Sequence, residues 1–370
     1  MSVLAQAFEE TKTSERRNVK TAAEVKNAAL PDEASFLGHI FSSPFFRGSY
    51  KEEKPEIDIK LKGSKNERKR LTALINTIVQ NSPTGKRLLQ DAAGNGYSLD
   101  FLVQSNSFGS CDRERKRVHL NPTFDDNKLI ATLAHETRHA QQHQRGVPEF
   151  YTTDMATEVR LRRATEADAQ AAAAQVALEI RAATKDDRVW RAFAQTAPII
   201  ARAVMKPSIE KSLGMVVDDQ TSTMQDAFKG WFDQSALVSV YEDRYLRNPM
   251  ISIGYQPVWA RLKEFKAMSF SKHLTSKQIV EKVCVTNSGD CYFKDDPNIM
   301  NTSHMCSILP ETRRTAEYFF KMRRELAGYA EDRSYRGLPI RCTKNAAVPR
   351  PARNNDEKSV FQALLKSRQR

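Results

Sequence analysis

The sequence predicts an α+β protein that is mainly helical, with short antiparallel strands before its most informative helix. Several long segments repeat their apolar residues at the spacing of a helix face. Two short segments, 97–103 and 116–120, alternate apolar and polar residues as half-buried strands do. No stretch of about 18 consecutive apolar residues occurs, so we expect no membrane span and no membrane partner.

Composition divides the 370 residues into four parts. Residues 1–64 are polar except for the small apolar cluster FLGHIFSSPFF, and we predict a flexible N-terminal extension there. Residues 65–270 are predicted to form the main domain. Residues 271–342 are expected to be a helical region packed on it, and 343–370 a basic, disordered tail.

The main domain is predicted to begin with two helices, over 66–80 and from Thr84 to about Ala93. Two or three short antiparallel strands follow up to Asn121-Pro122. A long helix then begins at Asp125 or Asp126, which can cap it, and ends near Gly146.

The rest of the chain is predicted to be mostly helical. An alanine-rich helix over about 154–184 can approach a neighbouring helix closely. Further helices are expected, with a long loop over 285–309 and a helix start at Pro310. The other expected helices span 186–204, 221–247, 256–268 and 310–333.

The net charge of +13 is explained by solubility alone or by an acidic partner, and the basic runs lack the interleaved aromatics of single-strand binders. Nucleic acid is therefore not the expected partner. Five cysteines without a C-x-x-C pair are typical of a reducing compartment, with thiols left free. The polar start lacks a secretory signal, which predicts a cytoplasmic protein or one exported by a dedicated secretion system.

The segment LAHETRHAQQ holds the most informative motif, His135-Glu136-Thr137-Arg138-His139. Residues four apart on a helix share a face, so both imidazoles can meet one ion. A catalytic zinc needs three protein ligands and an open position for water. Glu136 would lie beside the ion, where it can take a proton from the water that zinc activates. The alternative is a pair of histidines on an exposed helix.

The run LIATLAHETRHAQQ followed by RATEADAQAAA resembles the gluzincin group of zinc metallopeptidases. VHLNP, HETRHAQQ and EADAQA together are similar to a family of bacterial metallopeptidases with an H-E-x-R-H core. The resemblance implies a zincin-like fold, a Zn²⁺ cofactor and a peptide or protein substrate. It makes His135 and His139 ligands, Glu136 the general base and Glu166 the third ligand.

The residues themselves leave the third ligand open. Glu166 and Asp168 are two apart, so on a helix they point about 200° from each other and cannot both face the metal. Asp168 can instead accept a hydrogen bond from a ligand imidazole and act behind the ligands. Glu166, Asp168 or neither remain the choices.

Other residues are candidates for supporting roles. His143 is expected at the rim of the cleft and His119 as a partly buried structural residue. Arg138 is expected to pair with an acid of the 154–184 helix. Tyr241 and Tyr245 are candidate donors to the reaction's oxyanion, although the aromatic stripe around them favours the core.

The strand at 116–120 is expected to border the cleft and to pair with an extended substrate along its edge. Replacing Val118 by proline would test this hypothesis.

Two further interpretations stay open. The chain could be an inactive binding module that contacts an acidic protein or nucleic acid through its basic tail. It could also be a translocated effector, because its basic end is loosely similar to the C-terminal signals of some bacterial type IV secretion substrates.

Overall fold

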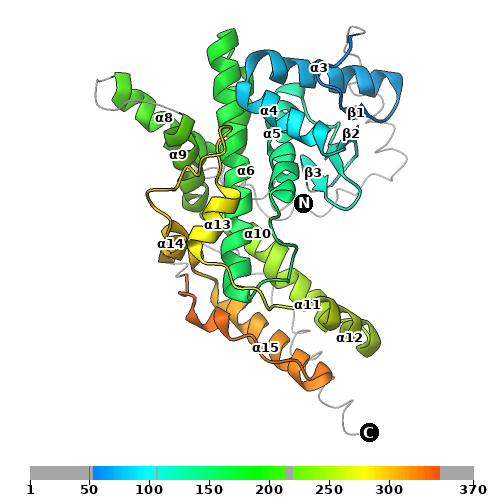
Figure 1. The fold of residues 1–370 in the computed structure, drawn as a ribbon, viewed down its shortest axis with the longest axis vertical. Helices are drawn as coiled ribbons and strands as arrows, with labels where there is room; N and C mark the ends of the chain where they lie inside the picture. Colours follow the sequence, from blue (N-terminus) through cyan, green and yellow to red (C-terminus); the bar gives the residue numbers. More distant parts are fainter. Residues whose placement is uncertain (1–49, 51–52, 106, 213–219, 342–370) are drawn as a thin grey trace, which may run out of the picture.

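The computed structural model describes residues 50, 53–105, 107–212 and 220–341 (Figure 1). Most of the predicted extension, with His39, and the whole predicted basic tail lie outside the described residues, as does Cys342. Within the described part, no helix is both long and apolar enough to cross a bilayer.

The first half of the described chain carries the sheet and the longest helices. Its elements are β1 (Lys60–Leu61), α3 (Lys65–Asn81), α4 (Pro83–Gly94), β2 (Ser98–Phe101), β3 (Gly109–Asp112), β4 (Arg117–Leu120), α5 (Asp126–Gln144) and α6 (Met155–Thr184).

The second half is made of shorter helices. They are α7 (Arg188–Thr196), α8 (Pro198–Ser212), α9 (Gln220–Asp233), α10 (Ser235–Glu242), the π-helix η2 (Asp243–Arg247), α11 (Asn248–Gly254), α12 (Val258–Ala267), α13 (Ser276–Val283), η3 (Ile299–Asn301), α14 (Ser303–Cys306), α15 (Pro310–Ala327) and η4 (Ser334–Gly337). The predicted loop over 285–309 therefore contains two short helical turns.

The four-stranded sheet is mixed, with the order β1-β2-β4-β3. β4 pairs antiparallel with β3, which lies between the two predicted strands, but β2, the other predicted strand, runs parallel to β4 and to β1. The antiparallel prediction is therefore wrong for β2. The cause is the connection between β2 and β3, after which β3 lies on the far side of β4. β3 and β4 then form the hairpin, and β2 pairs with the other side of β4.

This topology also corrects the expected substrate edge. β4 pairs on both sides, so residues 116–120 have no free edge. The edge strand next to β4 is β3, which lies in the turn-rich stretch between the two predicted strands. Its residues Gly109, Ser110 and Cys111 line a cleft beside α5.

α5 and α6 pack along each other in the middle of the molecule (Figure 1). Each begins at an aspartate whose carboxylate accepts a backbone N–H, Asp125 for α5 and Asp154 for α6. α6 is 30 residues long and buries alanines at helical spacing, including Ala164, Ala167 and Ala171. Small side chains at these positions let the two helix backbones approach closely.

The predicted helix over 221–247 is interrupted. α9 ends at Asp233, Gln234 leaves the helical conformation with φ −84° and ψ 74°, and α10 begins again at Ser235. The chain then widens into the π-helix η2 before α11. A π-turn adds a residue to the helical turn and shifts the faces that follow, a change that a 3.6-residue period does not reveal.

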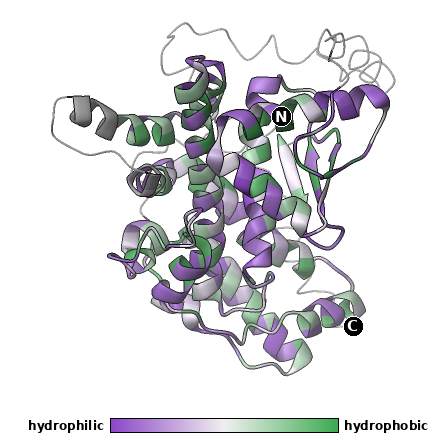
Figure 2. Cartoon of the chain, turned by 45° about the horizontal axis from the view of Figure 1, so that its top comes forward, coloured by the Kyte–Doolittle hydropathy of each residue, from purple (hydrophilic) through white to green (hydrophobic). Residues whose placement is uncertain are grey.

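Two hydrophobic clusters hold the described chain together. Hydrophobic and hydrophilic residues alternate along the helices that contribute to them (Figure 2). The first cluster joins the sheet, α3 to α9 and α13, and it includes α6 from Leu161 to Ile180. The second joins α11, α12 and α15 and is rich in aromatic side chains. The first turns of α6, through Met155, Ala156 and Val159, belong to this second cluster.

Candidate metal centre

Helix α5 presents His135 and His139 on one face, as their spacing predicts. Their Nε2 atoms lie 3.1 Å apart, and the two rings meet edge to face with centroids 4.7 Å apart. Two nitrogens at this distance both point at the same small volume. The pair therefore opens toward one common ligand position.

Glu166 approaches the same position from α6. Its Oε2 lies 3.5 Å from Nε2 of His135, and its Oε1 lies 3.6 Å from Nε2 of His139. The three ligand atoms all fall within 4.8 Å of one another, so this group could hold a metal ion. Glu166 Oε2 is buried without a hydrogen-bond partner, which is the state expected of an oxygen reserved for a cation. Two imidazole nitrogens and one carboxylate oxygen are a donor set that suits zinc.

The three side chains are electrostatically coupled. Burial opposes the ionisation of Glu166, but His139 and His135 outweigh it and hold the pKa of this carboxyl well below its usual range. Burial also lowers the pKa of His139, and the neighbouring Glu166 carboxylate overcomes this and raises that pKa to about 9. Without a metal, the site thus favours a protonated His139 beside an ionised Glu166.

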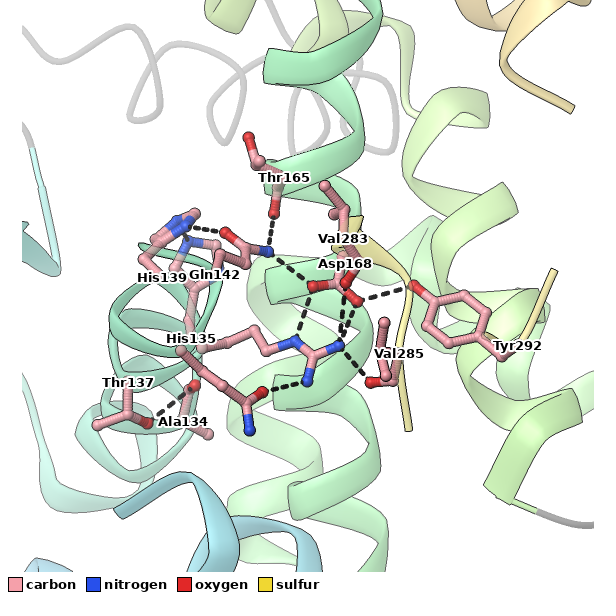
Figure 3. A network of polar contacts seen from close by, with 12 residues as sticks. Ala134, His135, Thr137, His139, Gln142, Thr165, Asp168, Val283, Val285 and Tyr292 are labelled. Atoms are coloured by element: carbon pink, nitrogen blue, oxygen red, sulfur yellow. Dashed lines mark hydrogen bonds and ion pairs between the residues drawn. The ribbon is translucent and has the colours of Figure 1, made fainter. Parts of the chain in front are cut away.

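His139 is oriented by a side chain of its own helix (Figure 3). Its Nδ1 donates to Oε1 of Gln142 at 2.8 Å. The amide nitrogen of Gln142 donates to the carbonyl oxygen of Thr165 at 2.9 Å and to Oδ2 of Asp168 at 2.6 Å. The helix that supplies Glu166 therefore also fixes the imidazole of His139.

Asp168 belongs to a buried network behind the ligands (Figure 3). Arg138 donates to both its carboxylate oxygens from Nε and one terminal nitrogen, each at 2.7 Å. The hydroxyl of Tyr292 donates to Oδ1 at 2.9 Å. Asp168 reaches His139 only through Gln142, one side chain further from the ligand than the sequence suggested.

The predicted pairing of Arg138 with an acid of the second helix is confirmed, but the pair is buried and not at the surface. The guanidinium also donates to the carbonyl oxygen of Val285 at 2.6 Å and to Oε1 of Gln141 at 2.5 Å. Arg138 thus ties α5 to α6 and to the segment after α13.

Glu136 follows His135 and lies in the cleft, where it lines both described pockets at the site. Burial is the largest influence on this carboxyl and raises its pKa above the usual value, against the effect of the two histidines. β3 lies close to it: a Cβ added at Gly109 would come within 3.1 Å of Cγ of Glu136 and 2.7 Å of the backbone oxygen of His119. Only glycine fits there without a shift of the strand or the helix.

The end of α10 and the π-helix η2 bring Tyr241, Arg244 and Tyr245 to the cleft. Tyr245 donates its hydroxyl to Oε1 of Glu166 at 3.0 Å. Tyr241 stacks on Tyr245, with ring centroids 5.5 Å apart, and lines both pockets with Arg244. The sequence favoured a core position for the two tyrosines, but the structure places both at the site.

His143 and His119 lie near the site without facing the common ligand position. His143 lines the cleft, where Tyr97 lies 3.2 Å from its Nδ1 and burial lowers its pKa to about 3. His119 pairs with Asp100 across two neighbouring strands. The four described cysteines are free, as the sequence predicts.

Three residues of this region were not among the candidates from the sequence, namely Gln142, Arg244 and Tyr292. Gln142 is three residues after His139, within reach on one helix face, and this spacing could have identified it. Arg244 depends on the π-turn, and Tyr292 lies more than 120 residues from Asp168. Neither of these two has a local sequence signal.

An H-E-x-x-H helix that faces a glutamate from the next helix is the arrangement of a metal-dependent peptidase. The sequence as a whole gives the particular family. The model described as "Putative metallopeptidase family (DUF6782)" matches residues 53–292, well over half of the chain. The chain therefore belongs to this family. No curated protein and no solved structure matches it.

Membership confirms the predicted resemblance to a metallopeptidase family. The narrower assignments to the gluzincin group and to a zincin-like fold stay predictions.

Proposed function

We propose that the protein hydrolyses peptide bonds with a zinc ion held by His135, His139 and Glu166. One observation carries the proposal: two imidazole nitrogens and a carboxylate converge within 4.8 Å beside the buried carboxyl of Glu136. When bound, zinc would supply a Lewis acid that polarises the substrate carbonyl and lowers the pKa of water to about 7.

Glu136 is the proposed general base. Its pKa is raised above that of an exposed glutamate and so lies closer to neutral pH. This suits a group that must both accept and return a proton. It takes the proton from the attacking water and gives it to the nitrogen of the leaving amine. Its neighbours His135 and Gly109 fix its position from the helix and from the strand.

Tyr241 and Arg244 are the proposed donors to the carbonyl oxygen as it gains negative charge. Both line the two pockets that Glu136 also lines. Tyr245 is already engaged with Glu166 and is proposed to orient that ligand. Asp168 and Gln142 are proposed to hold His139 in place.

An extended substrate is proposed to lie along β3, the outer strand beside the cleft. Proline at Cys111 would test this pairing. Cys111 lies opposite Val118 at a position whose backbone N–H faces away from β4, and proline cannot donate a backbone hydrogen bond. Turnover should fall while zinc content stays unchanged. The matched change in β4, Val118→Pro, should disrupt the sheet itself.

The first test is metal content by mass spectrometry, after purification without a chelator. We expect about one zinc per chain in the wild type. His139→Ala and Glu166→Ala should lose it, whereas a folded Asp168→Ala should retain most of it. A folded wild type without metal, even after zinc is added back, would refute the site and favour the inactive binding module.

Peptide cleavage is tested next, with Glu136→Gln as the control. This variant should bind zinc but lose turnover, because the amide cannot accept the proton. Zinc binding without cleavage of any peptide in a library would leave a metal-binding protein and refute the peptidase.

A further inference from the structure

The outer helix pair α11 and α12 carries an exposed apolar face. Tyr255 is 74% exposed and Trp259 is 73% exposed, although large aromatic side chains usually bury most of their surface. Three aliphatic side chains lie exposed near them in the chain, namely Ile251, Val258 and Leu262. Large exposed apolar side chains gathered within one short segment suit a contact surface.

The exposure does not come from a loosely attached helix. The opposite side of α12 buries Phe265 completely, against Phe319 of α15, with ring centroids 5.4 Å apart. Arg261 donates to the sulfur of Met322 in the same helix at 3.3 Å. α12 is thus fixed to the second hydrophobic cluster by its buried side. Its outward side is also apolar, although the helix is short.

Positive charges accompany this face. Val258, Leu262 and Lys266 are spaced four apart and follow one side of α12, and Lys263 flanks Trp259. Both lysines are exposed, and neither forms an ion pair with another described residue. Residues 248–272 contain four lysines and arginines and a single acid, Glu264.

We propose that this face of α11 and α12 binds the surface of an anionic lipid membrane. Tryptophan and tyrosine favour the boundary between headgroups and hydrocarbon, and lysines beside them reach anionic headgroups. The helix pair lies at the periphery of the molecule, near α15 (Figure 1). The contact is peripheral, so it needs no spanning helix, but it departs from the sequence expectation of no membrane partner.

A second copy of the chain fits this face less well. In a two-fold dimer the face would meet itself, so Lys263 and Lys266 would approach the same lysines of the other copy. Only one acid in the segment could compensate them. An anionic membrane offers both an apolar layer and the opposite charge.

The test uses the full chain with phosphatidylcholine vesicles, prepared with and without phosphatidylserine. We expect sedimentation with the anionic vesicles and release at high salt. Tryptophan emission should shift to the blue on binding. Trp190 and Trp231 are buried, so this shift reports on Trp259.

Trp259→Ser should weaken vesicle binding about tenfold, because one large side chain no longer enters the interface. Lys263→Gln and Lys266→Gln should each weaken it about fivefold, and only on anionic vesicles. Leu102→Ser and Lys86→Gln are the matched controls, because both residues are exposed on other parts of the chain. These two variants should bind as the wild type does.

Three results would overturn the proposal. The wild type could fail to bind anionic vesicles, or the Trp259 and lysine variants could bind as well as the wild type. Trp259 emission could also change without lipid, either with protein concentration or on removal of residues 1–49. A second copy or the N-terminal segment would then be the occupant. None of these readouts depends on zinc or on peptide cleavage.

Discussion

Two carboxylates of α6, only two residues apart, lie in opposite environments. Glu166 faces the two histidines and the cleft, and its Oε2 is buried without a hydrogen-bond partner. Asp168 faces the interior, where Arg138, Gln142 and Tyr292 satisfy both its oxygens. The polar contacts of Glu166 are incomplete, which suits binding of a cation. Those of Asp168 are complete, which suits a structural role.

This difference teaches which carboxylate should matter for stability and which for metal binding. The complete set neutralises a buried arginine, and removing one partner leaves an uncompensated charge. The incomplete set gains its missing partner only when a cation binds. Substitutions at Asp168 should therefore mainly lower stability, and substitutions at Glu166 should mainly abolish metal binding.

The largest expected effect is on the Asp168 side. Asp168→Asn should lower the free energy of unfolding by about 3–5 kcal/mol, because Arg138 stays buried without its counter-charge. Urea denaturation measures this change. Glu166→Gln is the matched control. Compared without metal above about pH 9, where the pairing of His139 with Glu166 no longer contributes, it should cost far less stability, and it should abolish zinc binding. Equal losses of stability in the two variants would contradict the assigned roles.

A smaller loss is expected when the whole pair is replaced. Arg138→Met combined with Asp168→Leu leaves no buried charge in this network. The remaining cost is that of the hydrogen bonds lost by Tyr292 and Gln142, and by Val285 and Gln141, which Arg138 contacts. We expect about 1–3 kcal/mol in the same denaturation experiment. A double variant less stable than Asp168→Asn would show that hydrogen bonds, and not charge pairing, dominate this network.

The link between the two sides is Gln142. Gln142→Ala should weaken zinc binding about 10–100-fold, as expected when a partner of a ligand imidazole is lost. Competition with a chelator of known affinity measures the change. Gln141→Ala is the matched control, because Gln141 contacts Arg138 and Asp91 but not His139. The link fails if the two variants bind zinc equally well.

Counted per pH unit, the smallest expected effect is the response of the metal side to pH. His139 has a pKa of about 9 in the folded, metal-free protein, above its ordinary 6.5, so zinc must displace a proton. Zinc affinity should rise about tenfold per pH unit between about 6.5 and 9. Calorimetry in buffers of different ionisation enthalpy should detect about one released proton at pH 7.

The stability of the metal-free protein should change in the opposite sense. A raised pKa stabilises the fold fully below pH 6.5, and this contribution is lost as pH rises through about 9. Bound zinc should remove this dependence. A metal-free protein that gains stability over the same range would contradict the pairing of His139 with Glu166.

The sequence predicted those parts of the site that depend on one helix. The spacing of His135 and His139, and the opposite directions of Glu166 and Asp168, both follow from 3.6 residues per turn. The helix bounds near Asp125 and Gly146 were equally local, because capping and stop signals lie within a few residues of the ends.

The parts that depend on distant contacts could not be predicted. The parallel pairing of β2 with β4 depends on which side of β4 the intervening segment takes, and short strands carry no signal for that choice. Tyr292 and Val285 reach the Asp168 network from beyond α13. Arg244 and Tyr245 reach the cleft through a π-turn inside a segment with ordinary helical periodicity.

The length of α6 has a consequence for how the molecule unfolds. Its first turns belong to the aromatic cluster and the rest of it to the larger one, with no break in the helix between them. Melting either cluster would strip one end of the same helix of its packing, and an isolated helical end gains little from its own hydrogen bonds. The described chain should therefore lose its structure in one cooperative transition, as if the two clusters were a single folding unit.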